Sequence, residues 1–197
     1  MLPRLVSTCR TILGTQYGKH MDMMQLLDEL DADFHAAKED GVTPAYVASQ
    51  KGHVDVLRLM GEIGVNFNAA TGDGSTPLHV ACLNGDAVVV RLLSELGADI
   101  KAVTNDGATP AFIASLNGHI DVVRLLVELG ADFNVATNDG LTPAYVASGN
   151  GHVDVVALLL KHGADFNVAD NDGASPLWIA SLKGHVEVVR LLGERLS

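Results

Sequence analysis

The 197-residue sequence contains few cysteines, few aromatic residues, few basic residues and no long apolar run. Its two cysteines, Cys9 and Cys82, are too few for a disulfide scaffold and suggest a reducing compartment. Only 13 lysines and arginines accompany 24 acidic residues, and the net charge of −11 argues against a nucleic-acid-binding protein. Because no stretch of about 18 apolar residues occurs, we expect no membrane-spanning helix.

What the sequence does contain is a repeat of 33 residues. An Asp-Gly pair recurs at this interval, and Thr-Pro or Ser-Pro follows each pair after one further residue. Residues 106–138 and 139–171 are identical at 23 of 33 positions. Such a period is typical of a solenoid, and the 48% of apolar residues argues against disorder. The pairs begin at Asp40, Asp73, Asp106, Asp139 and Asp172.

The period divides the chain into one continuous array without a linker. We expect a degenerate N-terminal capping repeat at 1–39 and a truncated C-terminal repeat at 172–197. Four full repeats are expected between them, at 40–72, 73–105, 106–138 and 139–171.

The first half of each repeat carries the signals of a short helix. In the repeat that begins at Asp106, Thr109 is a typical N-cap and Pro110 suits the first helical position. A helix over 111–116 is therefore predicted, and Asn117-Gly118 should end it.

The second half predicts another helix and a connecting loop. A stripe of apolar residues indicates a helix from about His119 to Leu129, which Gly130 ends. The following chain should be extended, with a turn at 138–140. Two helices of this size cannot bury their apolar faces alone, so the repeats must stack.

The sequence resembles the ankyrin-repeat family. The resemblance rests on the Asp-Gly turn, the sequence TPLH from Thr76 to His79, the Gly-His pairs and the endings GADI and GADF. It implies an all-α-type repeat solenoid of about six units including degenerate caps, each a helix–turn–helix with a β-hairpin-like loop. It also implies a non-enzymatic scaffold that binds a protein partner through a concave face of hairpin tips and inner helices.

Histidines recur at one repeat position, which could suggest a metal site. Zinc ligands must converge within a few ångströms of one centre, whereas residues one repeat apart stand in a row. We therefore expect structural histidines that bond loop backbone, with no metal and no cofactor. The row comprises His20, His53, His119, His152 and His185.

Aromatic residues replace the family's histidine after Thr-Pro in most repeats. They could form a stacking platform for a ligand, or a ladder packed between repeats. We favour packing, because a position that accepts Tyr, Phe and Trp alike indicates filling of volume. These residues are Tyr46, Phe112, Tyr145 and Trp178, and only His79 keeps the family residue.

Aspartates at the predicted turns form another row. Turn formation is the favoured interpretation, and a negative ridge that attracts a basic partner is the alternative. The spaced oxygen ligands and the terminal glutamate of an EF-hand loop are missing, which argues against calcium.

Catalysis is not expected from this sequence. Cys82 occupies a position where other repeats have serine, which suggests a small buried thiol and not a nucleophile. No Ser/His/Asp or Cys/His arrangement converges in a linear array, and no glycine-rich phosphate loop occurs.

By the family's pattern, partner contacts come from the turns and from the end of the first helix. Apolar anchors are expected at Leu83, Leu116, Leu141 and Leu182. The other predicted partner-binding residues are Asp73, Ser75, Asn105, Asp106, Asn138, Asp139, Asn171 and Asp172. The expected partner is a protein with a basic surface, and neither nucleic acid nor a membrane is expected.

The two ends allow alternatives. Residues 1–21 mildly resemble an organellar transit segment, but a terminal cap is the favoured interpretation, and a secretory signal is not expected. The C-terminal repeat keeps internal apolar residues, which suggests weak end-to-end self-association or an excised spacer module. A consensus-like array without a specific partner is also open. A cytoplasmic or nuclear location is expected.

Overall fold

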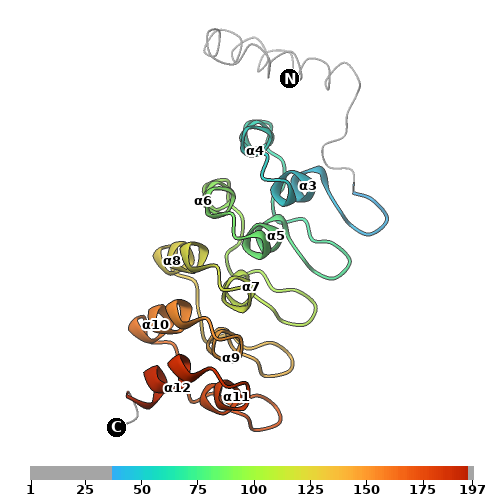
Figure 1. Ribbon diagram of the computed structural model, residues 1–197. Helices are drawn as coiled ribbons and strands as arrows, with labels where there is room; N and C mark the ends of the chain where they lie inside the picture. Colours follow the sequence, from blue (N-terminus) through green and yellow to red (C-terminus); the bar gives the residue numbers. More distant parts are fainter. Residues whose placement is uncertain (1–36, 195–197) are drawn as a thin grey trace, which may run out of the picture. The chain divides into compact units, whose positions relative to one another are not determined.

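The computed structural model describes residues 37–194, so the predicted N-terminal cap lies almost wholly outside the described residues. These residues form ten α-helices, which are arranged in five pairs, and they contain no strand (Figure 1). None of these helices has the length and apolar character needed to cross a membrane. The inner helices are α3 (Pro44–Gln50), α5 (Pro77–Asn84), α7 (Pro110–Leu116), α9 (Pro143–Gly149) and α11 (Pro176–Leu182). The outer helices are α4 (Val54–Glu62), α6 (Ala87–Glu95), α8 (Ile120–Glu128), α10 (Val153–Lys161) and α12 (Val186–Gly193).

Each inner helix begins where the Thr-Pro or Ser-Pro pattern predicts. Thr109 is the N-cap of α7, and its hydroxyl oxygen accepts a hydrogen bond of 3.1 Å from the backbone N–H of Phe112. Pro110 occupies the first helical position, where a missing N–H leaves no bond unmade. The predicted helix over 111–116 is confirmed, with Pro110 added at its start.

Each outer helix buries one apolar stripe. Helix α8 spans Ile120–Glu128, with His119 as its N-cap, so the predicted limits of 119 and 129 are each one residue too wide. Leu93, Leu126 and Leu159 occupy the same position in three repeats and are 0% exposed. Burial of one leucine side chain contributes about 1.5–3 kcal/mol, and the repeated column builds a continuous core.

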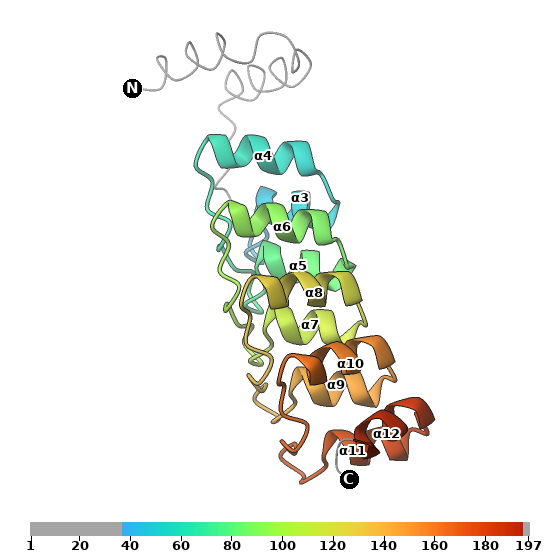
Figure 2. The same ribbon diagram turned by 90° about the vertical axis from the view of Figure 1, so that its left-hand side faces the viewer.

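The repeats stack in two parallel rows. Each inner helix packs against the inner helix of the next repeat, from α3 to α5 and so on to α11. The outer helices α4, α6, α8, α10 and α12 pack in the same order (Figures 1 and 2). Ala114 and Ala147 are fully buried in the inner row, where their small side chains allow close approach of the helices. The predicted all-helical repeat solenoid is confirmed for the described residues.

A hairpin-like loop joins each repeat to the next. In the loop before α9, the backbone N–H of Thr137 donates to the carbonyl of Leu141 (3.0 Å), and that of Gly140 donates to the carbonyl of Thr137 (2.9 Å). Gly140 has a φ of 79°, a conformation that favours glycine. These loops project beyond the inner helices, on the side away from the outer row (Figure 1).

Candidate functional site

Backbone hydrogen bonds join the tips of successive hairpins. The N–H of Asn105 donates to the carbonyl of Asp73 (2.9 Å), and Asn138 repeats this bond to Asp106 (2.8 Å). Asn171 makes the same bond to Asp139, at 3.2 Å. All the predicted tip asparagines and aspartates are exposed, and the bonds hold them in one row along the array.

The asparagine side chains in this row also hold the hairpins together. The Nδ2 of Asn105 donates to the carbonyl of Gly72 (2.9 Å), and that of Asn138 donates to the carbonyl of Asn105 (3.0 Å). Asn171 donates in the same way to the carbonyl of Asn138 (3.0 Å). Sequence reasoning assigned these residues to partner contacts and missed this structural use of their amide groups. The signal available was the recurrence of Asn before Asp-Gly every 33 residues.

The tip aspartates stabilise their own turns. The Asp73 carboxylate accepts hydrogen bonds from the Thr71 hydroxyl and from the Ser75 backbone N–H, the latter at 3.1 Å. These bonds lower the pKa of Asp73, and a bond from the Thr104 hydroxyl lowers the pKa of Asp106. The turn-forming role is confirmed for these two residues, and their exposure leaves the negative charge facing solvent.

Ser75 and Leu141 occupy one repeat position, directly before the N-cap residue of the inner helix. Ser75 is half-buried next to the Asp73 turn. Leu141 is also half-buried, and it packs against a cluster formed by Ala108, Phe112 and Val146. Leu141 therefore contributes to the contact between repeats as well as to the surface.

His79 shows how the family residue links two repeats. Its Nδ1 accepts a hydrogen bond from the Thr76 backbone N–H (3.2 Å), so the proton is assigned to Nε2, which donates to the carbonyl of Ala108 (3.2 Å). The side chain has no exposed surface. Burial lowers the pKa of His79, because it disfavours the charged imidazolium.

The aromatic replacements of this histidine act in different ways. Phe112 is buried in the cluster with Ala108 and Val146, which confirms the packing interpretation at this position. Tyr145 is half-buried, and its hydroxyl donates a hydrogen bond to the Asp170 carboxylate of the following hairpin. Burial is the larger cause that raises the pKa of Tyr145 to about 12. Trp178 is 53% exposed, so packing does not describe it.

The predicted apolar anchors at the helix ends differ in exposure. Leu83 and Leu182 are exposed, whereas Leu116 is half-buried. At the equivalent position α9 has Gly149, so the leucines at the helix ends do not form a continuous row. Leu116 and Gly149 line an open hollow of about 500 Å³ together with Asn117, Asn150, His152, Lys183 and His185. Of the predicted anchors, Leu116 lines this hollow.

Three members of the histidine row have a structural role. The Nε2 atoms of His119, His152 and His185 donate to the carbonyls of Leu83, Leu116 and Gly149 at 2.9, 3.0 and 2.9 Å. These carbonyls belong to the last turn of the inner helix of the preceding repeat. The prediction of backbone bonding is therefore confirmed for three members, although the acceptors lie in helix ends and not in loops. His20 lies outside the described residues. Among residues 37–194, no group of three potential ligands is placed to hold a metal ion.

Cys82 is a buried packing residue. It has no exposed surface and forms no disulfide. Burial raises the pKa of its thiol, which keeps the thiol protonated and unreactive. The prediction of a small buried thiol is confirmed.

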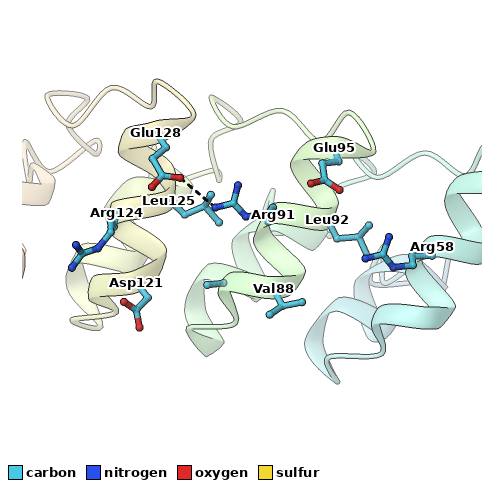
Figure 3. Close-up of a pocket in the computed structure, with 10 residues that line it drawn as sticks. Arg58, Val88, Arg91, Leu92, Glu95, Asp121, Arg124, Leu125 and Glu128 are labelled. Atoms are coloured by element: carbon cyan, nitrogen blue, oxygen red, sulfur yellow. Dashed lines mark hydrogen bonds and ion pairs between the residues drawn. The ribbon is translucent and has the colours of Figure 1, made fainter.

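The outer row contains a groove that sequence reasoning missed. It has a volume of about 290 Å³ and crosses α4, α6 and α8 (Figure 3). Arg91 of α6 forms an ion pair with Glu128 of α8 at 3.2 Å, and both side chains are about half exposed. The sequence signal was Val88, which stands where other outer helices have an acidic residue. The lining comprises Arg58, Ala87, Val88, Arg91, Leu92, Glu95, Asp121, Arg124, Leu125 and Glu128.

Comparison with protein families identifies the repeat. A family model described as ankyrin repeats, in three copies, matches residues 12–104, 59–137 and 112–196. Together these matches cover almost the whole chain. Comparison with curated proteins gives no match.

Proposed function

The chain belongs to the ankyrin-repeat family, whose repeats generally mediate protein–protein interactions, and we propose that it is a non-enzymatic scaffold that binds a protein through its hairpin tips and inner helices. The cytoplasm or nucleus is the proposed location, because a reducing compartment suits the free thiol of Cys82.

The row of bonded hairpin tips carries this proposal. Backbone bonds such as Asn138 to Asp106 fix the spacing of exposed polar groups before any partner arrives. A surface ordered in advance loses little conformational entropy on binding, which favours affinity. The exposed carboxylates of Asp73, Asp106, Asp139 and Asp172, on a chain of net charge −11, favour a partner with a basic surface.

Apolar anchors would supplement this polar row. Leu83 and Leu182 at the ends of α5 and α11 are exposed, and Leu116 and Leu141 are half-buried. Partially exposed leucines beside a polar rim are the kind of residue that an interface buries at its centre. Ser75 lies at the same surface position as Leu141 in an earlier repeat.

Charge reversal at a hairpin tip tests the proposal. Immobilised wild-type chain and an Asp139→Lys variant are each exposed to one lysate, and bound proteins are compared by quantitative mass spectrometry. We expect a bound protein that the variant loses, while its helical circular dichroism stays unchanged. Asp154→Lys is the matched control, since Asp154 is an exposed aspartate on outer helix α10. Equal capture by wild type and Asp139→Lys, or equal loss with both variants, contradicts the proposal.

A second candidate function is assembly through the C-terminal repeat. Trp178, Leu182 and Val186, in α11 and α12, are 53%, 65% and 64% exposed. Large apolar side chains at such exposure favour a contact with another protein surface, here proposed as a second copy.

Sedimentation across a range of concentrations tests this assembly. We expect self-association of the wild type that Leu182→Glu weakens and Leu83→Glu does not, because Leu83 is exposed on an internal repeat. A monomer at every concentration removes this second candidate.

A further inference from the structure

The repeat at 73–105 differs from the others at the start of its outer helix. The other outer helices have an acidic residue in their first turn, at Asp55, Asp121, Asp154 and Glu187. Helix α6 has Val88 at this position, and its side chain is 61% exposed.

The start of α6 does not require a valine there. Asp86 is the N-cap, and its Oδ1 accepts hydrogen bonds from the backbone N–H groups of Val88 (3.1 Å) and Val89 (3.0 Å). The negative charge that suits a helix N-terminus has therefore moved two residues towards the N-terminus. A β-branched, mostly exposed residue adds little helix propensity and little packing, so array stability does not account for Val88.

The surroundings of Val88 set this residue apart from an isolated exposed side chain. Val88 and Leu92 line the groove next to Arg58 of the preceding repeat (Figure 3). On the other side, Leu125 of α8 adds a further apolar surface. The groove therefore combines an apolar lining with a guanidinium group at its α4 end.

The arginines of this row are paired in different ways. In α12, Arg190 pairs with Glu187 three residues earlier, at 3.2 Å. Arg91 has Val88 at that distance, and it pairs with Glu128 of the next repeat. Arg58 forms no ion pair with any residue that the structure describes, so its planar group is available for a carboxylate.

We infer that this groove is a second protein-binding surface, which takes a segment with a bulky apolar side chain beside a carboxylate. The apolar side chain lies against Val88 and Leu92, and the carboxylate pairs with Arg58. Asp121, Arg124 and Glu128 line the α8 end of the groove, where the Glu128 carboxylate is already paired with Arg91. The surface lies on the outer row, away from the hairpins, so it can be occupied independently of the proposed partner site (Figures 1 and 2).

Three fluorescein-labelled nonapeptides test the inference by fluorescence anisotropy with the full chain. The first has a central Leu-Phe pair flanked by glutamates, the second has lysines in place of the glutamates, and the third has Ser-Ser in place of Leu-Phe. We expect binding of the first peptide, and affinity at least about tenfold lower for the other two, since each lacks one of the two contacts.

Matched variants locate the binding. Val88→Asp restores the residue type of the other repeats, so it should fold, and it should weaken binding of the first peptide at least about fivefold by removing the apolar contact and adding repulsion. Arg58→Ala should weaken binding of the first peptide and leave the second unchanged. Val103→Asp is the control, because Val103 is 52% exposed and lies in a hairpin loop. Equal binding of the three peptides, no binding at millimolar peptide, or an equal loss with Val103→Asp overturns the inference.

Discussion

The Nε2 of His152 lies 3.0 Å from the carbonyl oxygen of Leu116, the last residue of α7 in the preceding repeat. The last carbonyls of a helix have no partner within the helix, and the Leu116 carbonyl accepts this bond together with one of 2.8 Å from the Nδ2 of Asn150. The bond joins the start of one outer helix to the end of the neighbouring inner helix.

Replacement of His152 should destabilise the array. We expect His152→Ala to lower the free energy of unfolding by about 1 kcal/mol, the usual contribution of one such hydrogen bond, in urea denaturation followed by circular dichroism. His162→Ala is the control, because His162 is an exposed histidine outside the row. An equal loss in the two variants would show that the bond to Leu116 is not the cause.

A side chain at Gly118 should destabilise the fold for two reasons that can be measured separately. Its φ is 71°, and an added Cβ would lie 2.6 Å from the Nδ1 of His152. Gly118→Ala should therefore cost more than the roughly 1–2 kcal/mol of left-handed backbone strain alone. Gly130→Ala measures the strain by itself, since Gly130 has a φ of 79° and no atom within 4 Å of an added Cβ. Equal urea midpoints for the two variants would exclude a steric role of the His152 ring.

The buried His79 should make the stability depend on pH. Burial lowers its pKa below the usual value of about 6.5, against smaller opposite effects of hydrogen bonds to the backbone of Ala108 and Ala102 and of the charges of Asp73 and Asp106. Between the lowered pKa and the usual one, the unfolded chain binds a proton that the folded chain does not, so stability falls as the pH drops below about 6.5.

A phenylalanine at this position isolates that effect. Phe112 fills the same position in the next repeat, so His79→Phe should fold. Urea titrations at several pH values between about 7.5 and 5.5 should show a smaller loss of stability in His79→Phe than in the wild type. Parallel losses would mean that His79 does not titrate differently in the folded and unfolded chains.

The hydroxyl of Tyr145 should control the ionisation of Asp170. Its hydrogen bond is the largest cause that lowers the pKa of Asp170, because it stabilises the carboxylate. Tyr145→Phe should therefore raise the pKa of Asp170, followed by NMR titration of the carboxyl carbon. Tyr46→Phe makes the same change three repeats away, in the repeat at 40–72, and should leave the pKa of Asp170 unchanged.

The fold could be predicted because its signals are local and repeated. Thr109 with Pro110 starts α7, and the apolar stripe fixes α8 to within one residue at each end. The site was less predictable. The structural role of Asn138 depends on the 3.0 Å distance between its Nδ2 and the carbonyl oxygen of Asn105 in the neighbouring hairpin. The spacing of residues in the sequence does not give this distance.

The outer groove was harder still to foresee. Its lining comes from three helices in three repeats, and Arg58 and Val88 are 30 residues apart in the chain. The signal in the sequence was Val88, which departs from the acidic residue of the other repeats, and a repeat consensus does not contain such a departure. The exposure of Trp178 was missed for the opposite reason, because the repeat pattern equates it with the buried residues His79 and Phe112.

The bond from Asn138 to Asp106 has a genetic consequence, because Asn105 and Asn171 make the same bond to Asp73 and Asp139. Excision of the segment 106–138 would bring Asp139 directly after Asn105, and the two flanking hairpins would carry the same donor and acceptor groups that they use now. Unequal recombination between two copies would thus shorten or lengthen the gene by whole repeats, and each product would keep the backbone hydrogen bonds between neighbouring hairpin tips.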